Sequence, residues 1–120
     1  MFTYRELEVW KLSMDLVEQC YRTTTSFPRS EMYGLSSQLR RAAISIPLNI
    51  AEGYCRRTTK SYIHHLSIAL GSHGELETCI ELAGRLGFLS AEQKQGLADA
   101  TGTVGRLLNG LHRALQSKLK

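Results

Sequence analysis

Hydrophobic residues recur at alternating steps of three and four along most of this chain, which is the repeat of an α-helix with one buried face. The pattern predicts four helices, at about residues 3–25, 35–55, 58–86 and 91–115. The most regular row, in the fourth helix, consists of Leu97, Thr101, Val104, Leu108, Leu111 and Leu115. No segment shows the alternation of a strand bounded by turn residues. We therefore expect an all-α fold, an antiparallel up-down-up-down four-helix bundle that forms one domain over residues 1–120.

The first helix carries two adjacent hydrophobic rows, whereas a bundle interior usually covers one. One row consists of Leu7, Trp10, Met14, Val17 and Tyr21. The other consists of Val9, Leu12, Leu16 and Cys20. We expect part of this helix to be covered by another subunit, because a row left uncovered would be an exposed apolar patch.

Residues with strong local preferences mark the predicted helix ends. Helix starts are marked by capping boxes at Thr3–Glu6 and Ser90–Gln93 and by a cap at Thr58 or Thr59. Helix ends are marked by Pro28 and Gly87. Pro47 lies inside the second helix, where we expect a kink and not a break. Six glycines fall inside the third and fourth helices: Gly71, Gly74, Gly84, Gly102, Gly105 and Gly110. Because glycine is unfavourable in a helix interior, these positions predict close backbone approach between the two helices.

Composition narrows the class of protein only slightly. Fifteen Lys and Arg against eleven Asp and Glu give the 120-residue chain a formal charge of +4, which neither requires nor excludes a nucleic-acid partner. The N-terminal residues include Arg5, Glu6 and Glu8 without an apolar run, and no stretch approaches the ~20 apolar residues of a membrane span. We therefore expect a cytoplasmic protein. The three cysteines match no disulfide or metal-site spacing, so we expect reduced thiols, with Cys20 and Cys79 in the core.

Motifs that would indicate an enzyme were not found. The glycines lie in helical patterns with no preceding strand, so a phosphate-binding loop is not predicted. His65 and His73 share a face but lie two turns apart, too far for one metal ion without further ligands. His73 with Glu77 is more simply interpreted as a surface pair. We expect no catalytic residues, no metal, no other cofactor and no small-molecule substrate.

A polar row runs beside the hydrophobic row of the second helix and consists of Arg41, Ser45, Asn49, Glu52 and Arg56. Two interpretations are open. The row could be a ligand site, or Ser45, Asn49 and Glu52 could form a hydrogen-bonded network between helices that fixes their register. We favour the structural network, because no nucleophile is paired with a base.

Clustered basic residues are the candidate contacts to nucleic acid. They are Arg56, Arg57 and Lys60 in the second connection, Arg40 and Arg41 in the second helix, and Arg106 and Arg113 along one stripe of the fourth. Tyr54 and Tyr62 lie near the first group, and a mixture of cations with aromatic rings suits phosphate contact and base stacking. For Arg106 and Arg113 a simpler explanation is favourable interaction with a helix C-terminus.

Several short motifs resemble a bacterial family of four-helix bundles named after proteins encoded in 23S ribosomal RNA intervening sequences. The matching residues are Phe27-Pro28, Glu31, Tyr33-Gly34-Leu35, Gln38-Leu39-Arg40-Arg41-Ala42-Ala43, Ser45-Ile46, Asn49-Ile50-Ala51-Glu52-Gly53, Ile68-Ala69, Gly71-Ser72 and Glu75-Leu76-Glu77. The resemblance implies an up-down-up-down bundle that assembles as a ring, typically a pentamer, without catalytic activity. In a related branch, the accessory proteins of diversity-generating retroelements, a basic surface binds RNA and the reverse transcriptase.

Two functions follow from these observations. The first is a non-enzymatic homo-oligomeric adaptor, pentameric by the resemblance, whose basic surface binds RNA or RNA together with an RNA-processing protein. The second is an oligomeric protein scaffold with no nucleic-acid role. The first is preferred by a small margin, and an enzyme ranks well behind both.

Overall fold

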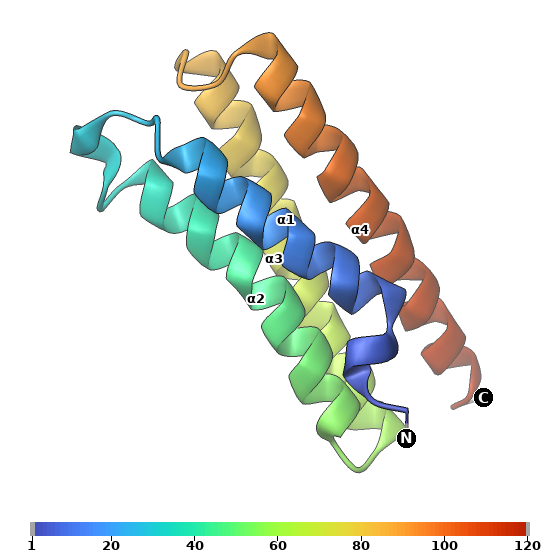
Figure 1. The fold of residues 1–120 in the computed structure, drawn as a ribbon. Helices are drawn as coiled ribbons and strands as arrows, with labels where there is room; N and C mark the ends of the chain where they lie inside the picture. Colours follow the sequence, from blue (N-terminus) through green and yellow to red (C-terminus); the bar gives the residue numbers. More distant parts are fainter. Residues whose placement is uncertain (1, 120) are drawn as a thin grey trace.

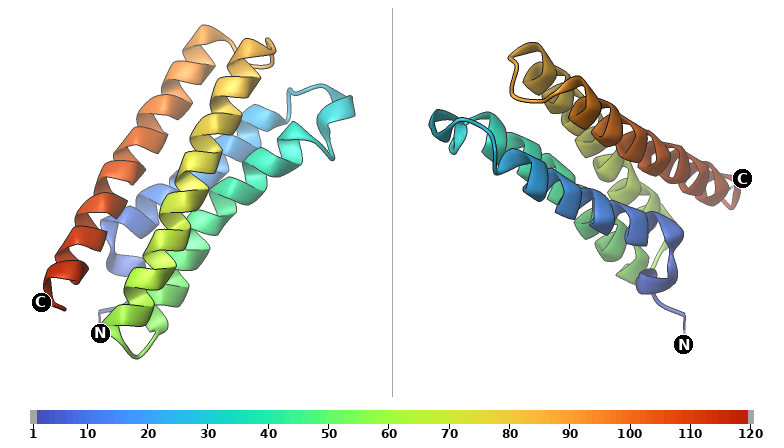
Figure 2. Two further views of the ribbon diagram at one scale, coloured as in Figure 1. Left: turned by 180° about the vertical axis from the view of Figure 1, so that it is seen from behind. Right: turned by 45° about the horizontal axis from the view of Figure 1, so that its top comes forward.

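Four long α-helices make up most of the computed structural model, which describes residues 2–119 (Figure 1). They are α1 (Glu8–Thr24), α2 (Leu35–Cys55), α3 (Thr59–Arg85) and α4 (Ala91–Ser117). Two 3-10 helices, η1 (Tyr4–Glu6) and η2 (Arg29–Glu31), precede α1 and α2. Successive helices run antiparallel, and α4 packs back against α1, as Figure 2 shows from two further directions. The predicted all-α up-down-up-down bundle is confirmed, as a rod of 47 × 23 × 22 Å.

Local capping chemistry explains most of the helix ends. Thr58 accepts a hydrogen bond from the Ser61 amide and begins α3, and the Ser90–Gln93 capping box begins α4, as predicted. Gly87 has a φ of 79°, which favours glycine at the end of α3. The predicted box at Thr3 is wrong. Thr3 accepts from the Arg5 amide and begins η1, because an extended residue at position 7 separates that short turn from α1.

The core takes one of the two hydrophobic rows of α1. Leu16 and Cys20 are fully buried and Val9 is 5% exposed, whereas Met14 and Tyr21 of the other row are 40% and 39% exposed. Burial raises the pKa of the Cys20 thiol to about 12, so this thiol stays protonated at neutral pH. The hydrophobic row of α4 is buried as predicted, except that Leu111 is half-buried. Within residues 2–119, no helix has both the length and the apolar character needed to cross a bilayer.

The glycines inside α3 and α4 do not bring two backbones together. A Cβ added at Gly71, Gly74 or Gly110 would meet nothing within 4 Å. The three atoms nearest to a Cβ at Gly84 belong to the Lys94 side chain, those nearest to a Cβ at Gly105 belong to the His73 side chain, and a Cβ at Gly102 would meet only Arg106. The expectation of close backbone approach was therefore wrong, because the inserted imidazole of His73 separates α3 from α4.

A glycine that does face the backbone of another helix lies between α2 and α3. A Cβ at the buried Gly53 would lie 2.9 Å from Cβ of His65 and 3.2 Å from the Tyr62 carbonyl oxygen. Glycine at this position lets α2 and α3 approach closely near the turn that connects them. α2 itself continues through Pro47 as one helix.

Candidate functional site

Three of the predicted basic residues lie together at the α2–α3 turn. Arg56 is the C-terminal cap of α2, and its Nη2 lies 2.6 Å from Oε2 of Glu52. Arg57 and Lys60 are exposed, and within residues 2–119 neither makes an ion pair. The turn therefore presents two cations that are free to meet a partner, and a third that is already paired within the chain.

Arg40 is committed to packing the bundle. Its Nε donates to Oγ1 of Thr24 at 2.7 Å, and its guanidinium lies 4.5 Å from the ring centroid of Tyr21. Arg41 beside it is exposed. Fifteen helical residues separate Arg41 from Arg56, about 22 Å along the axis, so the structure does not join these arginines to the α2–α3 turn.

Arg106 and Arg113 lie on the half of α4 that approaches the same end of the bundle as the α2–α3 turn (Figure 1). Both are exposed, and Arg106 donates to Oγ1 of Thr103 at 3.1 Å. The half of the bundle built from residues 2–16, 45–72 and 104–119 contains eight Lys and Arg against four Asp and Glu. The other half contains six against seven. The positive charge is thus concentrated toward the α2–α3 turn.

The aromatic residues near this turn pack against one another. The ring of Tyr54 lies 6.0 Å from that of Tyr62, 6.4 Å from that of Tyr4 and 5.9 Å from that of Phe2. The Tyr54 hydroxyl donates to the Phe2 carbonyl oxygen at 3.3 Å. Burial, and then the neighbouring Tyr54, raises the pKa of Tyr62 to about 12. This aromatic cluster holds the N-terminal segment onto α2 and α3, so Tyr54 and Tyr62 do not present free ring faces to a base.

The polar row of α2 faces α3 and forms a chain of hydrogen bonds with it. The Ser72 hydroxyl donates to Oγ of Ser45 at 2.7 Å. Nδ2 of Asn49 donates to the carbonyl oxygen and Oγ of Ser45 at 2.8 and 3.1 Å. Oδ1 of Asn49 then accepts from Nδ1 of His65 at 3.2 Å, which fixes the imidazole tautomer. Asn49 therefore links the two helices through both ends of its amide.

Glu52 continues this network toward the turn. Its carboxylate contacts Arg56, and its Oε2 lies 3.7 Å from Nε2 of His65. The hydrogen bond from Arg56, followed by the electrostatic effect of the nearby His65 side chain, lowers the pKa of Glu52 below its ordinary value. Arg41 takes no part in the network. Among residues 2–119 every fully buried side-chain nitrogen and oxygen has a hydrogen-bond partner.

His73 differs from the prediction of a surface pair. Its Nε2 donates to the Thr101 carbonyl oxygen at 2.8 Å, and its Nδ1 lies 3.6 Å from Oε1 of Glu77. The imidazole is only 12% exposed because it fills the space above Gly105. The sequence could not show this, because the partner is a backbone carbonyl of another helix. Within the described residues, no three His, Cys, Asp or Glu side chains gather to hold a metal ion.

An apolar groove runs between α1 and α2, with a volume of about 350 Å³. We call it the α1–α2 groove, and it is lined by Tyr4, Trp10, Met14, Val17, Ile44, Pro47, Leu48 and Ala51. Leu48 is 61% exposed at its edge. The α1 side is the hydrophobic row that the core leaves uncovered. The α2 side was missed, although Ile44, Leu48 and Ala51 recur at steps of four and three beside the core row.

Comparison with known proteins agrees with this architecture. Residues 5–110 match the family described as 23S rRNA-intervening sequence protein. The chain belongs to that family. A crystal structure of a protein of unknown function from the S23 ribosomal protein family of Bacteroides thetaiotaomicron superposes with a TM-score of 0.81 at 23% identity. The similarity covers 88% of this chain and 95% of the other, and it shows a shared fold. No curated protein matches the sequence.

Proposed function

We propose that this 23S rRNA-intervening sequence protein is a non-enzymatic homo-oligomeric adaptor, a pentameric ring whose basic surface binds RNA alone or together with a protein. The observation that carries the proposal is the α1–α2 groove. Leu48 at 61% and Met14 at 40% exposure leave large apolar side chains in water on two adjacent helices. Burying one leucine side chain is worth about 1.5 to 3 kcal/mol, and obligate interfaces have apolar centres of this kind.

The ring and its subunit number rest on the family. Members that this chain resembles assemble as rings, typically of five subunits, and a closed ring repeats one interface around its axis. In a ring the interface is heterologous, so the α1–α2 groove of one subunit receives a different surface of the next. In a closed ring, every α1–α2 groove is covered by a neighbouring subunit. This explains why an isolated subunit exposes so much apolar surface.

RNA binding is supported by the charge distribution. Arg57, Lys60 and Arg113 are exposed in the basic half of the bundle. A ring repeats these cations around its axis, and each phosphate that they neutralise releases counterions, so several weak contacts together hold one RNA. The binding is expected to depend on salt and little on sequence, because the aromatic rings beside the basic α2–α3 turn pack against one another and offer no platform for reading bases.

Substitution in the groove tests the assembly. Leu48→Asp places a charge in the proposed interface and should convert the oligomer to monomer, measured by light scattering after size exclusion. Leu82→Asp is the matched control, because Leu82 is 45% exposed on α3 outside the groove. Retention of the wild-type mass by a folded Leu48→Asp variant would contradict the use of this groove.

A protein scaffold without a nucleic-acid role remains the second candidate. It is favoured by the commitment of Arg40 and Arg56 to contacts within the chain, and by the packing of Tyr54 and Tyr62 in the aromatic cluster. Absence of RNA binding at low salt by an intact oligomer would select this function.

A further inference from the structure

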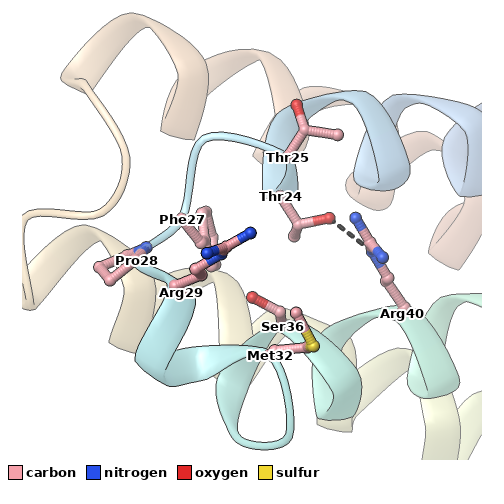
Figure 3. A pocket seen from close by; sticks show the side chains of 8 residues that line it. All are labelled: Thr24, Thr25, Phe27, Pro28, Arg29, Met32, Ser36 and Arg40. Atoms are coloured by element: carbon pink, nitrogen blue, oxygen red, sulfur yellow. Dashed lines mark hydrogen bonds between the residues drawn. The ribbon is translucent and has the colours of Figure 1, made fainter.

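A second cavity, of about 250 Å³, lies at the turn between α1 and α2, away from the α1–α2 groove and from the basic α2–α3 turn. Its lining combines Arg29 and Arg40 with the hydroxyl residues Thr24 and Ser36 and with an apolar wall that includes Phe27 and Met32 (Figure 3). We propose that this cavity binds a phosphate monoester. The proposal depends neither on the ring nor on RNA binding by the basic half.

Ser36 is the most informative residue of this cavity. It is only 7% exposed, yet within residues 2–119 its hydroxyl makes no hydrogen bond. Figure 3 shows the hydroxyl pointing into the cavity. Every fully inaccessible side-chain oxygen among residues 2–119 has a hydrogen-bond partner, so the unpaired Ser36 oxygen is one that stays accessible from the cavity. The Ser36 hydroxyl is therefore a donor held ready for an acceptor that enters the cavity.

The backbone around Ser36 also favours an anion. Ser36 and Ser37 are the second and third residues of α2, and their amides have no hydrogen-bond partner among the described residues. Such amides carry the positive end of the helix dipole. Glu31 is the acidic group nearest along the chain, and its Oε1 accepts from the Leu35 amide at 3.0 Å. That carboxylate satisfies the first amide of α2 and leaves the next two free.

The C-terminal end of α1 also faces the cavity, and unpaired carbonyl oxygens there would repel an anion. Donors within the chain reduce that repulsion. The Tyr21 carbonyl oxygen accepts from Nη2 of Arg40 at 3.5 Å, and the Arg22 carbonyl oxygen accepts from the Thr25 hydroxyl at 2.7 Å. The next two carbonyl oxygens of α1 accept backbone amides of the turn. The acceptors at this end are thus covered by donors.

Two arginines supply the charge. Arg40 uses Nε and Nη2 within the chain, so its Nη1 group retains free donors. Arg29 is exposed and has no ion-pair partner among the described residues, and Figure 3 shows its guanidinium over the same space as the Ser36 hydroxyl. A phosphate monoester carries about −1.5 to −2 charges at neutral pH and accepts through three oxygens, which matches two guanidinium groups with a hydroxyl.

Calorimetric titration of the full-length protein tests the proposal, with inorganic phosphate, a nucleoside 5′-monophosphate and the same nucleoside without phosphate as probes. We expect saturable binding of both phosphate compounds with Kd of about 0.1 to 1 mM, and none of the bare nucleoside. Arg29→Gln should weaken binding about tenfold, since it removes a charge-assisted contact, and Ser36→Ala about fivefold. Arg22→Gln is the matched control, because it removes one exposed charge from the nearby end of α1 without touching the cavity.

The outcomes separate cleanly. Absence of saturable binding up to about 10 mM phosphate compound, or an equal loss in Arg22→Gln and Arg29→Gln, would overturn the proposal, as would binding of the bare nucleoside at the same affinity. Amide chemical shifts of Ser36 and Ser37 that stay fixed while the wild-type protein is titrated would also overturn the proposal. This readout does not depend on whether the variants fold. An RNA oligonucleotide compared with and without a 5′-phosphate then shows whether the monoester comes from an RNA end or from a free small molecule.

Discussion

Replacement of Asn49 by alanine tests whether the polar network between α2 and α3 is structural. The wild-type amide donates twice to Ser45 and accepts from Nδ1 of His65. Alanine leaves that imidazole nitrogen without its acceptor, on a side chain that is only 12% exposed. An unsatisfied buried polar group costs about 1 to 3 kcal/mol, so the free energy of unfolding should fall by that amount.

For a domain of this size, 1 kcal/mol corresponds to about 3 to 6 °C in the melting temperature. We therefore expect Asn49→Ala to melt about 3 to 18 °C below wild type, by circular dichroism at one fixed protomer concentration. The matched control is Asn109→Ala on α4. Asn109 is exposed and donates only to the Gly105 carbonyl oxygen of its own helix, at 2.9 Å, so its loss should change the melting temperature little.

A wild-type melting temperature for Asn49→Ala would refute the structural interpretation. If that variant also lost binding of a protein or RNA partner, the polar row would be a ligand site. A loss of stability in Asn109→Ala as large as in Asn49→Ala would show that any helical asparagine is equally important, and that the contact with His65 contributes nothing special.

Three further predictions concern other parts of the chain. Gly53→Ala should destabilise the protein by about 1 to 3 kcal/mol in chemical denaturation, because its Cβ would press on His65 and the Tyr62 carbonyl, whereas Gly71→Ala, with nothing within 4 Å, should stabilise it by about 0.5 to 1 kcal/mol. The pKa of Glu52 is depressed in the folded state, so the contribution of this carboxylate to stability is present above the ordinary value of 4.5 and is lost as the pH falls through the folded pKa. Glu52→Gln should therefore flatten the loss of stability below pH 4.5 in acid titration. A Glu52→Gln profile identical to wild type would exclude that contribution. Arg57→Gln combined with Lys60→Gln should reduce the slope of log RNA affinity against log salt by about 2 per RNA-contacting subunit, and an unchanged slope would remove the α2–α3 turn from the RNA interface.

Helix positions and the core of α4 were predictable from the sequence because they depend on local periodicity. The Ser90–Gln93 box and the Thr58 cap were predictable for the same reason. Thr3 shows the limit of such motifs, since the same residue pattern began a 3-10 turn. The choice between the two hydrophobic rows of α1 was not predictable, because it depends on the angle at which α2 and α4 pack against that helix.

The candidate sites were less predictable than the fold. Charge alone could not show that Arg40 is held by Thr24 and Tyr21, or that Arg56 is paired with Glu52. The unpaired hydroxyl of Ser36 is likewise invisible in a sequence, because the absence of a hydrogen-bond partner is a property of the three-dimensional surroundings. Only the spacing of Ile44, Leu48 and Ala51 offered a signal, since it marks a second hydrophobic row on α2.

The mass of the wild-type particle tests the central claim most directly. One chain has a mass of 13.5 kDa, so a closed pentameric ring should scatter light as a particle of about 68 kDa, with no change on dilution through the micromolar range. A mass of 13.5 kDa at micromolar concentration would contradict the account, because the α1–α2 groove would then be exposed in the working protein.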